Sequence, residues 1–114
     1  MERVKVFRAL GDRRRMELLT LLLGHGYCVR ALARKLELSE ATVSQHLKVL
    51  REAGLLSSRR NGYFVHYEVD RAALRAAARE LELMAEAEHR PCGPEKECGD
   101  HGHCHGQRPE KDLR

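Results

Sequence analysis

We predict a mainly α-helical domain that carries one two-stranded β-hairpin, and three observations support this fold class. Residues 1–88 contain no proline, and apolar residues recur there at helical spacing over five segments. A turn of three residues, 37–39, separates the third segment from the fourth. The dipeptide Asn61-Gly62 lies between two runs of strand-like composition, and it is the strongest two-residue signal for a hairpin.

The first three helices are expected within residues 3–36. Apolar residues at positions 4, 7 and 10 predict a short helix that Gly11 ends. Asp12 is a good N-cap for a second helix, which ends at the Gly-His-Gly run of residues 24–26. The third helix is predicted from apolar residues at helical spacing: Val29, Leu32, Ala33 and Leu36.

The fourth helix is expected over residues 40–53, with Ser39 as its N-cap and Gly54 just beyond its end. Its apolar positions point one face inward, and its other side chains are short or planar hydrogen-bonding groups that suit the major groove of DNA. The third and fourth helices therefore form a helix-turn-helix candidate, and the alternative is an ordinary pair of packed amphipathic helices. The residues expected to face the groove are Thr42, Ser44, Gln45, His46 and Lys48.

The hairpin is expected to pair residues 55–60 with residues 63–69 around a type I′ turn at Asn61-Gly62. Arg59 and Arg60 flank this turn, so they can reach phosphates or a minor groove. A basic hairpin directly after a helix-turn-helix is the layout of a winged helix. This hairpin therefore favours DNA binding over the ordinary helix pair.

A long last helix is expected to begin after Asp70, its N-cap. Its apolar stripe can belong to the core or to a dimer interface. We favour a homodimer, because DNA readers of this size commonly pair to span two half-sites. The stripe comprises Leu74, Ala78, Leu81 and Ala85.

The net charge of the 114-residue chain is +4, and the positive charge is concentrated in one part. Residues 1–69 hold 13 Lys/Arg and 7 Asp/Glu, a surplus of +6, which is typical of a nucleic-acid binder although a solvated basic surface is the alternative. The longest pure apolar run, residues 21–23, is too short to span a membrane, and the first residues do not look like a signal peptide. We therefore expect a cytoplasmic protein whose cysteines are thiols or metal ligands.

The composition changes near His89. Residues 90–114 contain all three prolines and three of the four cysteines, so we divide the chain into a domain over 1–89 and a flexible tail over 90–114.

The chain resembles the arsenic-repressor (ArsR/SmtB) family of winged-helix metal sensors. The resemblance covers about residues 4–70, and it is carried by Phe7-Arg8-Ala9-Leu10-Gly11-Asp12, by residues 38–50 with Ser44-Gln45-His46-Leu47, and by Arg59-Arg60-Asn61-Gly62. It implies a homodimeric repressor with five helices and a two-stranded wing, in which the first and last helices form the dimer. It also implies that a bound metal or metalloid lowers the affinity for the operator DNA.

Both inducer sites that the resemblance implies are incomplete. Many members have Cys-Val-Cys at the start of the third helix, where this chain has Cys28-Val29-Arg30. The other common site needs an Asp and a His near the start of the last helix. This chain has Asp70 without that histidine, although Glu86 and His89 are present near the helix end.

The tail holds six thiol or imidazole groups within residues 92–105. Thiolates with imidazoles suit a soft ion such as Zn(II), Cd(II) or As(III). Cys28 is either a small buried residue or one more thiolate ligand. The alternatives for the tail are a disordered segment with incidental His and Cys, or metal storage without sensing. The predicted metal ligands are Cys92, Cys98, His101, His103 and Cys104.

The leading prediction is a DNA-binding repressor released by a soft metal or metalloid. One alternative is a thiol-redox or sulfur-responsive repressor, and another is a metal-buffering or delivery protein with a winged-helix interaction module. An enzyme is not expected, because the chain has no Gly-rich phosphate loop, no Gly-x-Ser-x-Gly elbow and no His-Glu-x-x-His pair.

Overall fold

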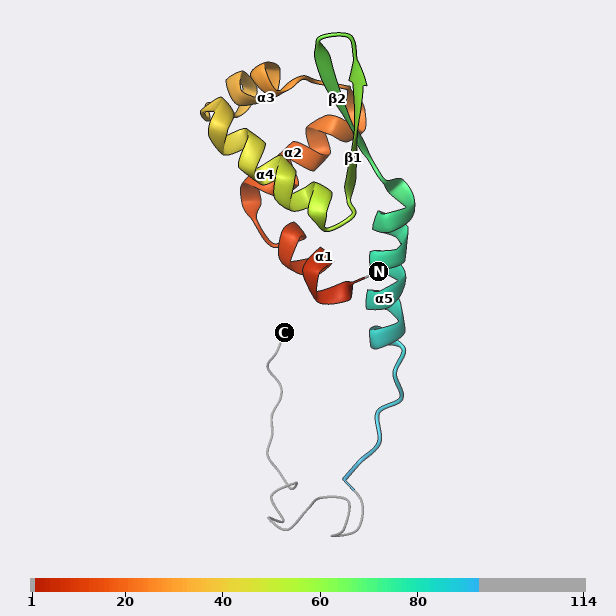
Figure 1. The fold of residues 1–114 in the computed structure, drawn as a ribbon. Coiled ribbons are helices and arrows are strands. Elements are labelled where there is room, and N and C mark those ends of the chain that lie inside the picture. The colour runs from red at the N-terminus through yellow and green to blue at the C-terminus, as the bar shows by residue number, and fades with distance from the viewer. Residues whose placement is uncertain (1, 93–114) are drawn as a thin grey trace. The chain divides into compact units, whose positions relative to one another are not determined.

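The computed structural model describes residues 2–92. Within them the chain forms five helices and one antiparallel pair of strands, as predicted (Figure 1). No helix among these residues has the length and the apolar character that crossing a membrane would require. The elements are α1 (Arg3–Leu10), α2 (Arg13–Gly24), α3 (Val29–Leu36), α4 (Glu40–Glu52), β1 (Leu56–Asn61), β2 (Phe64–Val69) and α5 (Arg71–Ala85).

The chain divides into two units, Met1–Met84 and Ala85–Arg114. The first unit holds the hairpin and all the helices, apart from the final residue of α5. Of the second unit the structure describes residues 85–92, which are exposed and form no helix or strand beyond Ala85.

Side-chain caps begin three of the helices at the predicted residues. The carboxylate of Asp12 accepts a hydrogen bond from the backbone N–H of Arg15 at 3.1 Å. The Ser39 hydroxyl accepts from the Thr42 N–H at 3.0 Å, and the Asp70 carboxylate accepts from the Ala73 N–H at 3.0 Å. Each cap satisfies a backbone donor that has no partner inside its helix, so three predicted helix starts are confirmed.

A leucine-rich core joins the helices to the base of the hairpin. Leu18 of α2, Leu32 of α3 and Leu47 of α4 are each 0–1% exposed, and Leu55 before β1 is 0% exposed. Burying one such side chain stabilises a fold by roughly 1.5–3 kcal/mol. The core therefore holds α3 and α4 in one arrangement against α2.

The turn between α3 and α4 depends on Glu37, which has a left-handed backbone with φ 58°. Its N–H donates to Arg34 O at 3.3 Å, and the N–H of Leu38 donates to Ala33 O at 2.9 Å. These two bonds close the end of α3 in a Schellman-type cap and turn the chain into α4.

The hairpin pairs Leu56 with Val69 at its base and Asn61 with Phe64 at its tip. Gly62 and Tyr63 are therefore the two turn residues, and the prediction of a turn at Asn61-Gly62 is wrong by one residue. Gly62 has φ +69°, whereas Tyr63 does not have a positive φ. A positive φ at the first turn position alone is characteristic of a type II′ turn, not type I′, and this turn also matches the twist of paired strands.

Candidate nucleic-acid interface

Helix α4 presents one polar face to solvent. Val43, Leu47 and Leu50 are buried, and the period of 3.6 residues places Gln45 on the opposite side of the helix. The predicted groove residues Thr42, Ser44, Gln45 and Lys48 are all exposed. This face can therefore meet a surface outside the domain without disturbing the core.

Thr42 has a second contact at the start of α4. Its Oγ1 accepts a hydrogen bond of 2.9 Å from the Ser39 hydroxyl, which also caps the helix. The Thr42 hydroxyl can still donate, because a hydroxyl is a donor as well as an acceptor.

His46 differs from the other predicted groove residues because it is only partly exposed. Its Nδ1 lies 3.4 Å from Nη1 of Arg15 on α2. One side of the ring is therefore directed toward the domain. His46 was predicted to face the DNA groove like the exposed residues of α4. The contact with Arg15 could not be predicted from the spacing of residues along α4, because Arg15 lies on another helix.

The carboxylate of Asp12 lies beside this contact. Its pKa is lowered from the usual 3.8, chiefly because it accepts the backbone hydrogen bond from Arg15. Partial burial opposes that effect, and the positive charge of Arg15 adds to the lowering. Asp12 is therefore the negative group that balances the cations at this end of α2.

The two predicted wing arginines have different surroundings. Arg59 lies opposite His66 in the hairpin, and its Nη2 is 3.6 Å from Oε1 of Glu68. Arg60 lies opposite Val65 and forms no ion pair within the described part of the chain. Both are exposed, and the pairing of Arg59 with Glu68 is weak because solvent screens it.

Aromatic side chains occupy the tip of the wing, although only Arg59 and Arg60 were predicted to contact DNA there. Tyr63 is 99% exposed and Phe64 is 61% exposed. Two of the five aromatic Phe and Tyr residues of the chain are thus at the tip of one hairpin. Because the turn was predicted one residue too early, Tyr63 was expected to begin a strand, whereas it lies in the turn itself.

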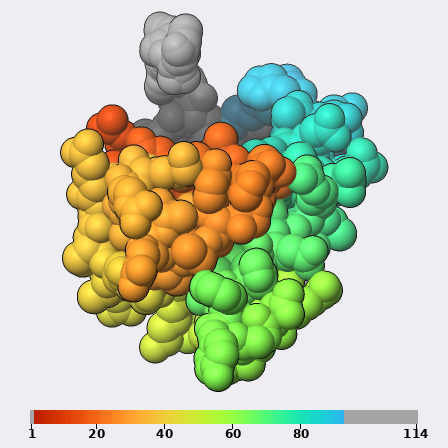
Figure 2. All heavy atoms as spheres, turned by 90° about the horizontal axis from the view of Figure 1, so that it is seen from above, coloured from red at the N-terminus to blue at the C-terminus, as the bar shows by residue number. Residues whose placement is uncertain are grey.

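A hollow of about 450 Å³ separates the wing tip from the start of α3 and the start of α4. It is lined by Tyr63 and Phe64 on one side and by Arg30 and Glu40 on the other, whose side chains form a 3.7 Å ion pair. Figure 2 looks onto this end of the domain and shows the green atoms of the wing beside the orange atoms of α3. The wing tip and the first turn of α4 therefore border one surface.

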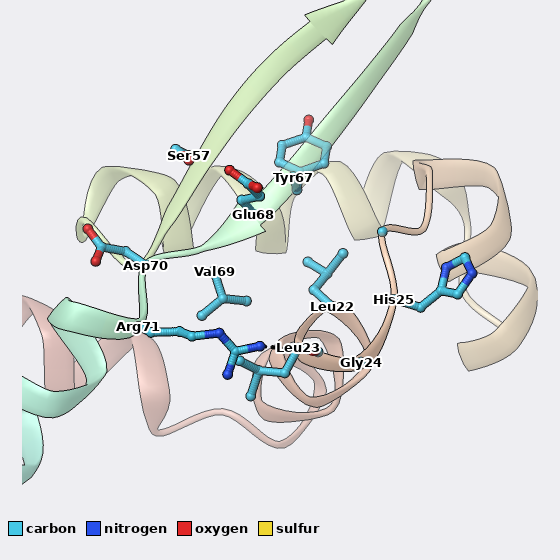
Figure 3. A pocket seen from close by; sticks show the side chains of 11 residues that line it. Leu22, Leu23, Gly24, His25, Ser57, Tyr67, Glu68, Val69, Asp70 and Arg71 are labelled. Atoms are coloured by element: carbon cyan, nitrogen blue, oxygen red, sulfur yellow. Dashed lines mark hydrogen bonds between the residues drawn. The ribbon is translucent and has the colours of Figure 1, made fainter.

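A second hollow, of about 610 Å³, lies where α2 ends and the hairpin meets α5. Figure 3 shows Arg71 extending from the start of α5 to Leu23, whose carbonyl accepts its hydrogen bond at 3.1 Å. The backbone N–H of Asp70 donates to Leu55 O at 2.9 Å at the same place. These bonds tie the start of α5 to both α2 and the base of the wing.

No metal centre is formed by residues 2–92, because they contain no group of three His, Cys, Asp or Glu side chains that could hold an ion. Cys28 is a partly buried free thiol at the N-cap of α3. Glu86, His89 and Cys92 are exposed. The other predicted ligands lie outside the described residues: Cys98, His101, His103 and Cys104.

Comparison with known proteins decides the family. Residues 12–58 match the model of the arsR family of bacterial regulatory proteins. The chain is 33% identical over 87 residues to the transcriptional activator HlyU of Vibrio cholerae, and the match covers 76% of this chain and 74% of HlyU. The chain belongs to the arsR family. It is thus a transcriptional regulator with a winged helix-turn-helix, and the predicted resemblance is confirmed.

Two further matches describe other members. The chain is 43% identical over 65 residues to the arsenic resistance transcriptional regulator ArsR1 of Pseudomonas putida; this covers 56% of the chain but only 51% of ArsR1, about half of its length. A solution structure of a homodimeric winged helix-turn-helix DNA-binding domain from Mycobacterium bovis, a possible ArsR-family regulator, has a TM-score of 0.61. That domain is 27% identical, and the match covers 76% of this chain and 85% of that domain.

Proposed function

We propose that this arsR-family protein is a homodimeric repressor that leaves its operator DNA when its tail captures a soft metal or metalloid. The observation that carries the DNA-binding part is the exposed polar face of α4 beside a basic wing. We place its action in the cytoplasm, where bacterial operator DNA is found.

In the proposed complex α4 enters the major groove and the wing lies along the backbone or in the adjacent minor groove. Ser44, Gln45 and Thr42 supply donors and acceptors to base edges, and Lys48 contacts a phosphate. Arg60 is the better phosphate ligand of the two wing arginines, because no carboxylate of the described residues pairs with it.

The dimer is proposed to form through α1 and α5. Large apolar side chains on these helices are exposed in the single chain: Val4 is 61%, Leu81 53% and Met84 61% exposed. Leu81 and Met84 continue the face on which Ala77 is buried. A second copy would cover this apolar surface, and the relative from Mycobacterium bovis is homodimeric.

The inducer is proposed to be As(III), Cd(II) or Zn(II), held by thiolates and imidazoles of residues 92–104. The six thiol and imidazole groups within residues 92–105 support a site in the tail. The name of the relative ArsR1 supports a metalloid, since that protein regulates arsenic resistance.

A thiol-responsive regulator is the second candidate, and the partly buried free thiol of Cys28 favours it. In that case an oxidant without metal would release the DNA, and Cys28→Ser would abolish the response.

The test is an anisotropy titration of the full chain on the DNA upstream of its own gene, with arsenite, cadmium and zinc added in turn. We expect at least one ion to weaken binding about tenfold or more, which is 1.4 kcal/mol. Unchanged affinity with every ion would refute the sensing part, and no affinity for any duplex would refute DNA binding.

The ligand set is tested by replacing Cys92, Cys98 and Cys104 together with serine. This variant should bind DNA as the parent does and no longer respond to the ion. Cys28→Ser is the matched control, because it removes one thiol outside the tail and should leave the metal response intact.

A further inference from the structure

The guanidinium of Arg15 contacts the end of α1 before it reaches α4. Its Nε donates to the carbonyl of Ala9 at 2.7 Å and its Nη2 donates to the carbonyl of Arg8 at 3.3 Å. The side chain is only 16% exposed. Two carbonyls of α1 thus set the plane of a rigid, mostly buried donor group.

The guanidinium has two further contacts, one with the Asp12 carboxylate, whose Oδ2 lies 3.9 Å from Nη1, and one with α4. Nη1 of Arg15 donates to Nδ1 of His46 at 3.4 Å, a long hydrogen bond. A guanidinium has only donors and stays protonated in proteins, so Nδ1 must be the acceptor. The proton of the neutral imidazole is then on Nε2, because the hydrogen bond made by one ring nitrogen sets the state of the other.

The charged groups that face the His46 ring are Arg15 and Asp12, both at the start of α2. Within residues 2–92 no other hydrogen bond engages the imidazole, so Nε2–H has no acceptor inside the described domain.

We propose that Arg15 is a positioning residue that makes His46 present Nε2–H as a hydrogen-bond donor to the DNA. The proposal rests on the proposed function, in which α4 lies in the major groove. A donor at this position recognises an acceptor: O6 or N7 of guanine, N7 of adenine, O4 of thymine, or a phosphate oxygen.

The first measurement is the tautomer of His46 in the full chain, read from two-bond proton–nitrogen correlations of ¹⁵N-labelled protein at neutral pH. We expect the Nε2–H form in the parent and a mixture of both tautomers in Arg15→Lys. This variant keeps the positive charge and loses the planar set of guanidinium N–H donors. A parent ring in the Nδ1–H form would overturn the proposal.

The second measurement is DNA affinity. Arg15→Lys and His46→Ala should each weaken binding by about tenfold, which corresponds to 1.4 kcal/mol. The double variant should bind no more weakly than His46→Ala, because both changes remove one interaction. His46→Gln, which keeps an acceptor for Arg15 and a donor for DNA, should retain most of the affinity.

Arg14→Lys is the matched control, because Arg14 is the neighbour that pairs with Glu17 on its own helix at 3.1 Å. It should bind as the parent does, and thermal unfolding checks that all variants are folded. Additive losses in the double variant, or parental affinity in His46→Ala, would overturn this proposal alone. A parent that binds no duplex would overturn the proposed function together with it.

The acceptor is identified on modified DNA. If the acceptor is a purine N7, one 7-deazapurine in the bound site should abolish the difference between the parent and His46→Ala. If it is a phosphate oxygen, one methylphosphonate should do so. A difference that survives every such replacement and every change of guanine or thymine in the site would contradict a donor role for His46.

Discussion

Arg3 of α1 donates a hydrogen bond of 2.7 Å to the carboxylate of Glu80 on α5. The two residues are 77 positions apart in the chain, so this bond brings the first and the last helix of the domain together. Exposed apolar side chains of both helices, Val4 and Met84 among them, belong to the surface that we propose for the dimer.

Leu81→Glu should shift the protein toward monomer, because a charge would have to be buried against the second copy. We expect the dissociation constant of the dimer to rise at least about tenfold, since covering one leucine contributes roughly 1.5–3 kcal/mol. Sedimentation velocity over a range of concentrations measures this. Leu83→Glu is the control: Leu83 is 47% exposed, against 53% for Leu81, but it lies off the stripe, and its variant should remain dimeric.

Gln45 and Lys48 should have different effects on DNA binding, although both are exposed on α4. Gln45→Ala should cost about 1–3 kcal/mol on the operator and relax the preference for one base pair. Lys48→Gln should weaken binding to all sequences alike and reduce the slope of log K against log salt by about 1. Anisotropy on specific and scrambled duplexes at several salt concentrations separates the two, and identical behaviour of both variants would argue against this docking.

Tyr63→Ala should weaken operator binding by about fivefold, which is roughly 1 kcal/mol, because the nearly fully exposed ring loses water when the wing tip meets DNA. Tyr63→Phe should keep most of the affinity, since the phenyl ring provides the apolar surface that is removed from water on binding. A loss in Tyr63→Phe as large as in Tyr63→Ala would show that the hydroxyl, not the ring, makes the contact.

Asp12→Ala should lower the free energy of unfolding by about 1 kcal/mol, because α2 loses its N-cap. Urea unfolding at fixed protein concentration measures this, as a dimer's stability depends on concentration. Asp12→Asn is the control, since an amide oxygen also caps well.

Asp12 should also make the free energy of unfolding depend on pH. The pKa of Asp12 is lower in the folded protein than its usual 3.8, so the folded state binds this proton less readily than the unfolded state. Its contribution to stability is therefore complete above about pH 3.8 and is lost as the pH falls through the lower folded value. The stability difference between the parent and Asp12→Ala should shrink over that acid range, and a constant difference would contradict the assignment.

Local signals in the sequence predicted the order of the elements, because caps and apolar periods act within a few residues. Asp12, Ser39 and Asp70 are caps as predicted. The hairpin turn is displaced by one residue because strand pairing sets its register, and Gly62 supplies a positive φ in either arrangement. Helix α4 ends at Glu52, one residue earlier than predicted, where helix ends commonly vary.

Contacts between residues that are far apart in the chain could not be predicted from the sequence. Arg15 and His46 are 31 residues apart, and only the packing of α2 against α4 brings them together. The family resemblance identified the reading helix and the wing, whereas the roles of Gln45, Lys48 and Arg60 stay predictions. The tail ligands also stay predictions, because four of the five lie beyond the described residues.

The backbone bond from Asp70 to Leu55 joins the two residues that flank the hairpin, and α5 begins at the very next position. The base of the hairpin is therefore connected directly to the first turn of α5. In the proposed complex this connection would couple the position of the wing on DNA to the position of α5, the helix that we propose for the dimer.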